Sequence, residues 1–260
     1  MEASNMTVIT IANQKGGVGK TTTALCIAEQ LQKKKKRVLL IDMDPQCNAT
    51  TTYQAQIEDE YTMYDYLNRS KEDTFTFRDM IQHAPGGDIV ANDYKLAGVE
   101  AQYAADWDNV FVIKHALEEI TDDYDFVIFD TPPTLGFYMK SALIASDGVI
   151  IPIKAEKYAV DGLGNILDSI ERSKEFNPRL QVYGVVLTVF DKRNGLDVEI
   201  ERILPESGEQ IGFPVFKTVI RVCQQIKDAQ NGQQRLIDAY PKARATEDYR
   251  KLVNEILRKV

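Results

Sequence analysis

The chain has few of the residues that build metal centres and disulfide frameworks. Its 260 residues include three cysteines and two histidines, and no two of the cysteines form a CxxC pair. Iron–sulfur clusters, zinc sites and disulfide-rich secreted folds need paired or clustered ligands of these types, so the sequence argues against all three. We interpret the cysteines as reduced thiols and assign no role to His83 or His115.

Long hydrophobic runs are also absent. No window approaches the run of about 18 apolar residues that spans a bilayer, and the opening residues MEASNM do not resemble a signal peptide. The composition is nevertheless 44% hydrophobic, which is enough to bury a substantial core. We expect a single cytoplasmic domain over residues 1–260, and the sequence leaves open whether residues 1–5 are a disordered extension before a start at Met6.

Basic residues are scarce in one part of the chain and concentrated in another. The net charge is −8, but residues 58–125 carry 17 acidic and 5 basic side chains, whereas residues 217–260 carry 10 basic and 5 acidic ones. Screening limits the influence of distant charges to about 10 Å, so a basic face on an acidic body can still hold phosphates. From charge alone, a DNA-binding face and a solvated helical face fit the C-terminal stretch equally well.

The most informative segment present is KGGVGKTT, which follows a strand-like run and opens an amphipathic helix. Its three glycines let the backbone wrap around oxyanions and direct amides at them. We expect Lys20 to reach the β and γ oxygens of a nucleoside triphosphate and Thr21 to place its hydroxyl on Mg²⁺. The predicted nucleotide-binding residues are Lys15, Gly16, Gly17, Val18, Gly19, Lys20, Thr21 and Thr22.

Lys15 departs from the usual phosphate-loop pattern. That pattern has a glycine where this chain has Gln14, and here a second lysine directly precedes the glycines. One lysine suffices for the loop's own nucleotide, so Lys15 predicts a contact with a nucleotide bound to a facing subunit, and hence a homodimer across ATP. The alternative is a solvated surface lysine.

Short apolar runs alternate with helical patterns along the chain. The predicted strands are residues 7–12, 38–41, 88–91, 126–129, 149–153, 182–189 and 214–220; helical patterns cover the stretch after the phosphate loop and residues 109–120, 134–145, 160–176 and 195–204. Strands that are apolar throughout and separated by helices predict an α/β fold. We expect a three-layer, doubly wound, mostly parallel sheet with helices on both faces, as in P-loop NTPases, with the ligand at the carboxyl ends of the strands.

Three aspartates follow predicted strands. Asp42 and Asp44 lie in IDMDPQCN, and Asp130 lies in FVIFDTPP. A carboxylate beside polyphosphate needs a cation, so Asp42 and Asp130 are candidates for holding Mg²⁺ through its waters, and Asp44 for orienting the attacking water. The alternative for each is a helix cap or a turn former.

Taken together, five motifs resemble the ParA family of partition ATPases, within the deviant-Walker-A, MinD-like class. They cover nearly the whole chain: KGGVGKTT, IDMDPQCN, FVIFDTPP, PIKAEKYAVDGL (residues 152–163) and VVLTVFDKR (residues 185–193). The resemblance implies slow, partner-stimulated ATP hydrolysis with Mg²⁺ in a homodimeric ATP sandwich. It also implies non-specific binding of double-stranded DNA, a ParB-like centromere-binding partner, and a nucleoid-associated role in plasmid or chromosome partition.

The same resemblance implies roles for individual residues. Lys15 would contact the partner's nucleotide, and Lys20 would hold phosphates together with Thr21, which also binds magnesium. Asp44 would position the hydrolytic water, while Asp42 and Asp130 would support the metal. Catalysis would therefore depend on Lys15, Lys20 and Asp44.

The match weakens in the stretch TVIRVCQQIKDAQNG, residues 218–232. Arg221 stands where family members commonly have proline, and two glutamines occupy the place of an expected arginine. Arg193, in the FDKR motif, matches a DNA-contacting arginine of the family. The weaker candidates for DNA contact, chosen from charge and neighbourhood, are Arg221, Lys227, Lys242 and Arg244.

The C-terminal segment has an apolar helical face flanked by basic residues. The face comprises Tyr249, Leu252, Val253, Ile256, Leu257 and Val260. A membrane-surface helix, as in a MinD-like positioning ATPase, is the alternative function that this pattern allows. We favour packing of the helix on the body, and so no membrane partner, because no Trp or Phe is present on this face.

Overall fold

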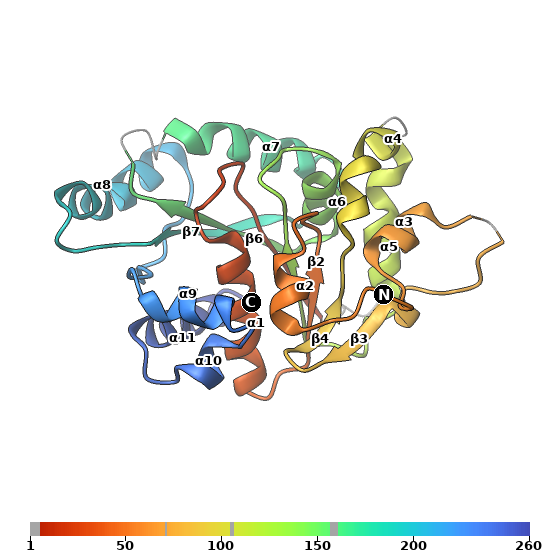
Figure 1. Ribbon diagram of the computed structural model, residues 1–260. Helices are drawn as coiled ribbons and strands as arrows, with labels where there is room; N and C mark the ends of the chain where they lie inside the picture. Colours follow the sequence, from red (N-terminus) through yellow and green to blue (C-terminus); the bar gives the residue numbers. More distant parts are fainter. Residues whose placement is uncertain (1–5, 71, 105–106, 157–160) are drawn as a thin grey trace.

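The computed structural model describes residues 6–70, 72–104, 107–156 and 161–260 (Figure 1). The predicted extension 1–5 and part of the motif at residues 152–163 lie outside these ranges. Seven strands form one sheet in the order β3-β4-β2-β5-β1-β6-β7. Their bounds are β1 Thr7–Ile11, β2 Val38–Asp42, β3 Ile81–Ala84, β4 Gly87–Val90, β5 Phe126–Asp130, β6 Gly148–Lys154 and β7 Gln181–Thr188.

The strands pair in parallel, except that β3 and β4 form an antiparallel hairpin at one edge. β2 and β5 are buried at every position, as expected for parallel strands covered on both faces. The register aligns Asp130 with Ile11 on one side and with Asp42 on the other. The carboxyl ends of three central strands therefore meet at one edge of the sheet, where the phosphate loop begins.

Helices cover both faces of this sheet (Figure 1). Alternate strand residues point to opposite faces: Ile9 and Leu40 pack in one core cluster with α1, α9, α10 and α11, whereas Leu39 and Ile41 pack in another with α3, α5 and α6. A third cluster joins β6 and β7 to α6, α7 and α8. The predicted three-layer, doubly wound α/β fold is confirmed.

The helices differ in length and in how they begin and end. The α-helices are α1 Lys20–Lys33, α2 Asn48–Tyr53, α3 Met63–Asn68, α4 Glu100–Ala104, α5 Val112–Glu118, α6 Phe137–Ala145, α7 Gly164–Lys174, α8 Gly195–Ile211, α9 Gln224–Asn231, α10 Leu236–Ala239 and α11 Arg244–Ile256. Four short 3₁₀ helices complete the described elements: η1 Arg78–Met80, η2 Tyr94–Gly98, η3 Trp107–Phe111 and η4 Asp161–Leu163.

Several elements differ from the sequence prediction, and three of these differences have a plain reason in the chain. β3 was missed, because its residues IQHA lack the β-branched run that marks the other strands. The predicted strand at 214–220 forms only an isolated parallel bridge, from Val215 to Val185 in β7, and a second bridge joins Arg221, just after it, to Phe190, just beyond the end of β7. The helix predicted to end at residue 204 continues through Pro205 and ends where Gly212 adopts a left-handed φ of 92°.

The C-terminal helix packs on the body of the protein. Tyr249, Leu252, Val253 and Ile256 are each at most 1% exposed, and the Tyr249 hydroxyl lies 3.1 Å from the Thr23 hydroxyl on α1. The apolar face of α11 is therefore buried in the core, as we favoured, although Val260, beyond the end of the helix, is exposed. No helix in the described part of the chain has the length and apolar character needed to cross a membrane.

Candidate nucleotide site

The phosphate loop joins β1 to α1 at the carboxyl edge of the sheet. Gly17 and Gly19 have left-handed φ angles of 75° and 82°, and a Cβ atom at either position would meet nothing within 4 Å. Glycine is therefore required here by the backbone conformation and not by crowding. Gly19 caps α1 without a side-chain hydrogen bond, so the first amides of a 14-residue helix remain available to an anion.

A cleft of about 440 Å³ opens over this loop. Its walls come from the phosphate loop, the loop after β2, α2, the loop after β5 and α9; the lining residues are Gly16, Gly17, Gly19, Lys20, Thr21, Thr22, Asp44, Asn48, Thr51, Thr52, Pro133, Gln230 and Asn231. Six of the eight predicted loop residues therefore line one cavity with Asp44. Val18 instead turns inward: it is 2% exposed, and its carbonyl accepts a hydrogen bond from the Thr188 hydroxyl at 2.8 Å.

Lys20 is the cation at the base of the cleft. It is only 7% exposed, and its Nζ donates to the backbone carbonyl of Lys15 at 3.1 Å. Burial lowers the pKa of this amine, while the nearby charges of Asp130 and Asp44 act in the opposite direction. A bound polyphosphate would supply the negative charge that favours the protonated amine.

Asp130 is buried without hydrogen-bond partners. It is 0% exposed, and neither carboxylate oxygen accepts a hydrogen bond from the described residues. Burial, followed by repulsion from Asp42, raises the pKa of this carboxyl well above its ordinary value. Thr21 lies near enough to oppose the rise, although its hydroxyl makes no hydrogen bond to either oxygen. An unpartnered buried carboxylate beside a threonine hydroxyl and a phosphate loop fits a site for Mg²⁺.

Asp42 has a different environment. Its Oδ2 accepts hydrogen bonds from the Thr50 amide at 2.9 Å and the Thr50 hydroxyl at 2.8 Å, and its Oδ1 accepts one from the Asp44 amide at 3.0 Å. The structure therefore gives Asp42 the turn-forming role that we set against metal binding, and its metal role stays a prediction. Asp42 shapes the loop that carries Asp44, which is 7% exposed and reaches the cleft.

The three aspartates do not form a metal centre by themselves. Among the residues that the structure describes, no cluster of three or more His, Cys, Asp or Glu side chains is arranged to hold a metal ion. This agrees with magnesium chemistry, because Mg²⁺ is usually held by one or two protein oxygens together with substrate phosphates and water. Asp130 and Thr21 are the residues that best fit that pattern here.

Lys15 is not among the residues that line the cleft. Its amine is paired with the carboxylate of Glu156, just after β6, and half of its side chain is exposed at 51%. The backbone beneath it is fixed by Asn13, whose Oδ1 accepts from the Lys15 amide at 2.9 Å and whose Nδ2 donates to the carbonyl of Pro152 at 2.8 Å. Sequence reasoning missed both Asn13 and Glu156.

α9 forms a wall of the cleft that the sequence did not indicate. Gln230 donates from Nε2 to the Thr22 hydroxyl at 3.0 Å, and Asn231 lies beside it in the lining. Both side chains are uncharged and exposed at the end of a polar helix, a pattern that carries no sequence signal. They add amide donors and acceptors to the lining of the cleft.

The predicted DNA-contact residues divide into two groups. Arg193 forms a forked ion pair with Asp191, and Arg221 forms another with Asp248, which is 3% exposed. Arg244 is close to this group, since its carbonyl accepts from Arg221 at 3.4 Å. Lys227 on α9 and Lys242 before α11 are exposed and form no ion pair with any described residue.

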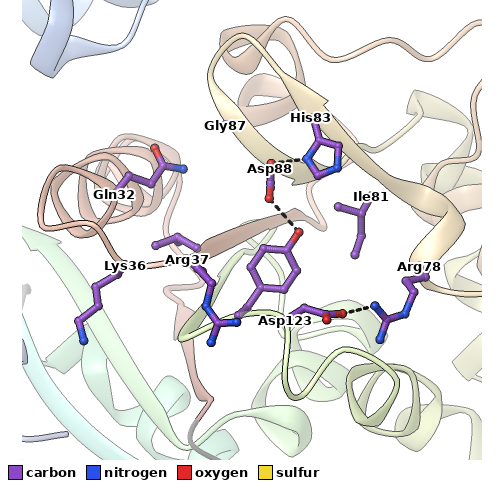
Figure 2. A pocket seen from close by; sticks show the side chains of 11 residues that line it. Gln32, Lys36, Arg37, Arg78, Ile81, His83, Gly87, Asp88 and Asp123 are labelled. Carbon is purple, nitrogen blue, oxygen red and sulfur yellow. Dashed lines mark hydrogen bonds and ion pairs between the residues drawn. The ribbon is translucent and has the colours of Figure 1, made fainter.

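A larger cleft, of about 510 Å³, lies by the β3–β4 hairpin and the end of α1 (Figure 2). Its polar groups are largely satisfied by one another. Asp88 accepts from the Tyr124 hydroxyl at 2.9 Å and lies 2.7 Å from Nδ1 of His83, while Arg78 is paired with Asp123. We assign this cleft no function.

Comparison with known proteins places the chain in a family. Residues 6–182 match the family model AAA_31, described as "AAA domain". The sporulation initiation inhibitor protein Soj of Bacillus subtilis is 35% identical over 96% of this chain and 97% of its own length. The chromosome partitioning protein ParA of Caulobacter vibrioides is 34% identical over 99% of this chain and 96% of its own length.

Solved structures agree with the fold. A putative plasmid partition protein from Borrelia burgdorferi, bound to AMPPNP, superposes with a TM-score of 0.79 at 26% identity and covers 98% of this chain and 99% of its own. Cobyrinic acid a,c-diamide synthase from Mycobacterium smegmatis, with a bound ATP analogue and magnesium, has a TM-score of 0.81 at 27% identity and covers 97% and 95%. The relatives span the chain nearly end to end, and the phosphate-loop motif lies in the matched region: this chain belongs to the ParA family of partition ATPases.

Proposed function

We propose that the chain is an ATP-dependent dimerising switch for plasmid or chromosome partition. It binds ATP and Mg²⁺, closes as a homodimer over two nucleotides, holds double-stranded DNA without sequence preference at the nucleoid, and hydrolyses ATP slowly until a ParB-like partner stimulates it. One observation carries the proposal: the phosphate loop has one lysine, Lys20, that lines its own cleft, and a second, Lys15, that does not line it and pairs with Glu156.

The cleft supplies the groups that ATP hydrolysis requires. The loop amides, Lys20 and Thr22 would hold the phosphates, and Thr21 with Asp130 would hold the magnesium ion, which neutralises charge on the phosphate oxygens when bound. Asp44 lines the same cleft, and its carboxylate can orient a water molecule there. Relatives solved with AMPPNP or with an ATP analogue and magnesium support this assignment.

Lys15 would make hydrolysis depend on assembly. A cationic group placed at a transferring phosphoryl group contributes a factor of about 10³ to 10⁵ in rate, or about 4 to 7 kcal/mol. In the protomer the Lys15 amine is paired with Glu156, so the cleft lacks this second cation until a partner supplies it. A lone protomer should bind ATP and turn it over very slowly.

Two lysine substitutions test the proposal. Lys20→Gln should abolish binding of a fluorescent ATP analogue, because it removes the buried cation of the cleft. Lys15→Gln should leave analogue binding within twofold of the parent, yet abolish both the dimer seen by sedimentation with a non-hydrolysable analogue and the stimulated turnover. Lys154→Gln is a matched control, since Lys154 is an exposed lysine at the end of the neighbouring strand β6.

The outcome that contradicts the proposal is a Lys15→Gln variant that dimerises and responds to stimulation like the parent. Such a result would be consistent with the proposed nucleotide site but would contradict the proposed ATP-sandwich dimer. Loss of analogue binding in Lys15→Gln would instead mean that Lys15 serves its own cleft.

A further inference from the structure

A third cleft lies at the edge of the sheet far from β3. It has a volume of about 420 Å³ and is formed by the chain segment that runs beside β7 and the last turns of α11. Its lining residues are Lys217, Thr218, Lys251, Asn254, Glu255, Arg258 and Lys259. Four of these seven residues are basic, one is acidic, and none is apolar.

The single acidic residue of the cleft, Glu255, already accepts hydrogen bonds from the edge segment. The Glu255 carboxylate accepts hydrogen bonds from the backbone amides of Lys217 and Thr218, each at 2.9 Å, and from the Thr218 hydroxyl. It forms no ion pair with a basic side chain among the described residues. Glu255 therefore anchors α11 to the edge segment and leaves the cations of the cleft largely uncompensated.

The cations themselves are available to a ligand. Lys217 and Arg258 are exposed and form no ion pair within the described part of the chain. Lys259 lies over the ring of Phe216, 5.4 Å from its centroid, and Lys251 shares Glu247 at 3.4 Å, a surface pair of little energetic weight. By contrast, Arg193 and Arg221 are held in forked pairs by their own carboxylates.

We propose that this cleft binds the phosphate backbone of double-stranded DNA, with Lys217 and Arg258 as the principal contacts. The inference rests on the proposed function and names the surface through which DNA is held. Uncompensated cations around a polar groove suit phosphates, and contacts of this kind carry no sequence preference.

The structure favours DNA over an anionic membrane as the partner. A peripheral helix binds lipid by inserting an apolar face beneath its basic flank. The apolar face of α11 is buried against α1 and the sheet, and no apolar side chain lines the cleft. The basic side chains beside α11 are therefore exposed to solvent, while its apolar face is buried. This arrangement suits a ligand such as DNA, which needs no apolar surface to be inserted into a bilayer.

The test compares two double variants of the full chain. Lys217→Gln with Arg258→Gln removes two cations from the cleft, and Lys33→Gln with Lys34→Gln removes two exposed lysines at the end of α1. Affinity for duplexes of unrelated sequence is measured across a salt series, with and without a non-hydrolysable ATP analogue. Each lost phosphate contact reduces the magnitude of the slope of log affinity against log salt by about 0.9. The cleft variant lacks two contacts, so its slope should be smaller in magnitude by about 1.8. It should then bind duplexes roughly 60-fold more weakly than the parent at 0.1 M salt.

The control variant should keep the parent slope, and both variants should bind the ATP analogue and unfold like the parent. Equal slopes for parent and cleft variant would overturn the inference, and so would an equal loss in the control, which would indicate a general charge effect. Binding of the parent to phosphatidylglycerol vesicles but not to duplexes would also overturn it. If ATP fails to alter duplex affinity while the cleft variant still loses slope, the switch of the proposed function fails and the cleft assignment stands.

Discussion

Glu29 is a buried acid whose ionisation should make the stability of this protein depend on pH. It lies on α1, is 2% exposed, and accepts a hydrogen bond from the backbone amide of Ile237 at 3.2 Å, where α10 begins. Burial raises the pKa of this carboxyl from 4.5 to about 7, even though that amide and the charge of Arg235 oppose the rise. The folded protein therefore holds the Glu29 proton more tightly than the unfolded chain does.

The direction and size of the effect follow from that difference. The stabilisation from the bound proton is fully present below pH 4.5, declines as pH rises, and is lost above about pH 7, where Glu29 is ionised in both states. One pH unit in this window corresponds to about 1.4 kcal/mol, so the ionised carboxylate should lower the free energy of unfolding by about 3 kcal/mol at pH 8.

Glu29→Gln isolates this contribution, because glutamine keeps an acceptor oxygen for the Ile237 amide but cannot ionise. Urea unfolding of parent and variant at several pH values from 5 to 8.5 gives the difference in their free energies of unfolding. We expect the variant's advantage to grow by about 2 to 3 kcal/mol between pH 5 and pH 8. Glu199→Gln, at an exposed position of α8, is the matched control for the change of side chain. A pH-independent difference for Glu29→Gln would refute the reasoning.

Three further substitutions test the packing of the fold, each by thermal or urea unfolding. Cys47 has a left-handed φ of 53°, which costs a residue with a side chain about 1 to 2 kcal/mol, so Cys47→Gly should be neutral or stabilise by up to about 1 kcal/mol; clear destabilisation would contradict this. Thr50→Val removes the buried hydroxyl that donates to Asp42 and should destabilise by about 1 to 3 kcal/mol, whereas an unchanged stability would show that Asp42 finds another partner. A Cβ at Gly148 would lie 2.2 Å from the Tyr183 ring, so Gly148→Ala should destabilise by about 1 to 3 kcal/mol unless that ring can move.

The sequence predicts the parts of the site that are contiguous in the chain. The residues from Gly16 to Thr22, apart from Val18, line one cleft because they are consecutive in the chain, and Gly17 and Gly19 have the left-handed conformations that the turn requires. The sheet was predictable for the same reason, since β1, β2 and β5 are each a buried apolar run. β3 was not predicted, because a partly exposed edge strand does not need a buried apolar run.

Parts of the site that depend on distant residues were not predictable. Asp42 and Asp130 look alike in sequence, because each ends a strand. Yet Thr50 and the Asp44 amide donate to the carboxylate oxygens of Asp42, and no described residue donates to those of Asp130. The partner of Lys15, Glu156, lies 141 residues away, and its position is set by the pairing of β6 beside β1. Such choices follow from tertiary packing, which local patterns do not encode.

The pairing of Lys15 with Glu156 leads to a last prediction. If the proposed dimer forms, this ion pair must break before Lys15 can reach a partner's phosphate, so Glu156 competes with the nucleotide for the same amine. Glu156→Gln should then strengthen analogue-dependent dimerisation by a factor of up to about five, because an exposed pair of this kind is weak. The gain should shrink as salt screens the parent's pair.

Sedimentation at two salt concentrations measures this effect, and Glu171→Gln is the matched control because Glu171 pairs with Lys174 on the distant helix α7. The sign of the result distinguishes two roles for Glu156. A resting counterion for Lys15 restrains assembly, so its neutralisation helps the dimer. A residue that contacts the facing subunit promotes assembly, so the same substitution would weaken the dimer and contradict the resting-partner role. Since Lys15 and Glu156 pair with each other and neither lines the cleft, we expect the first result.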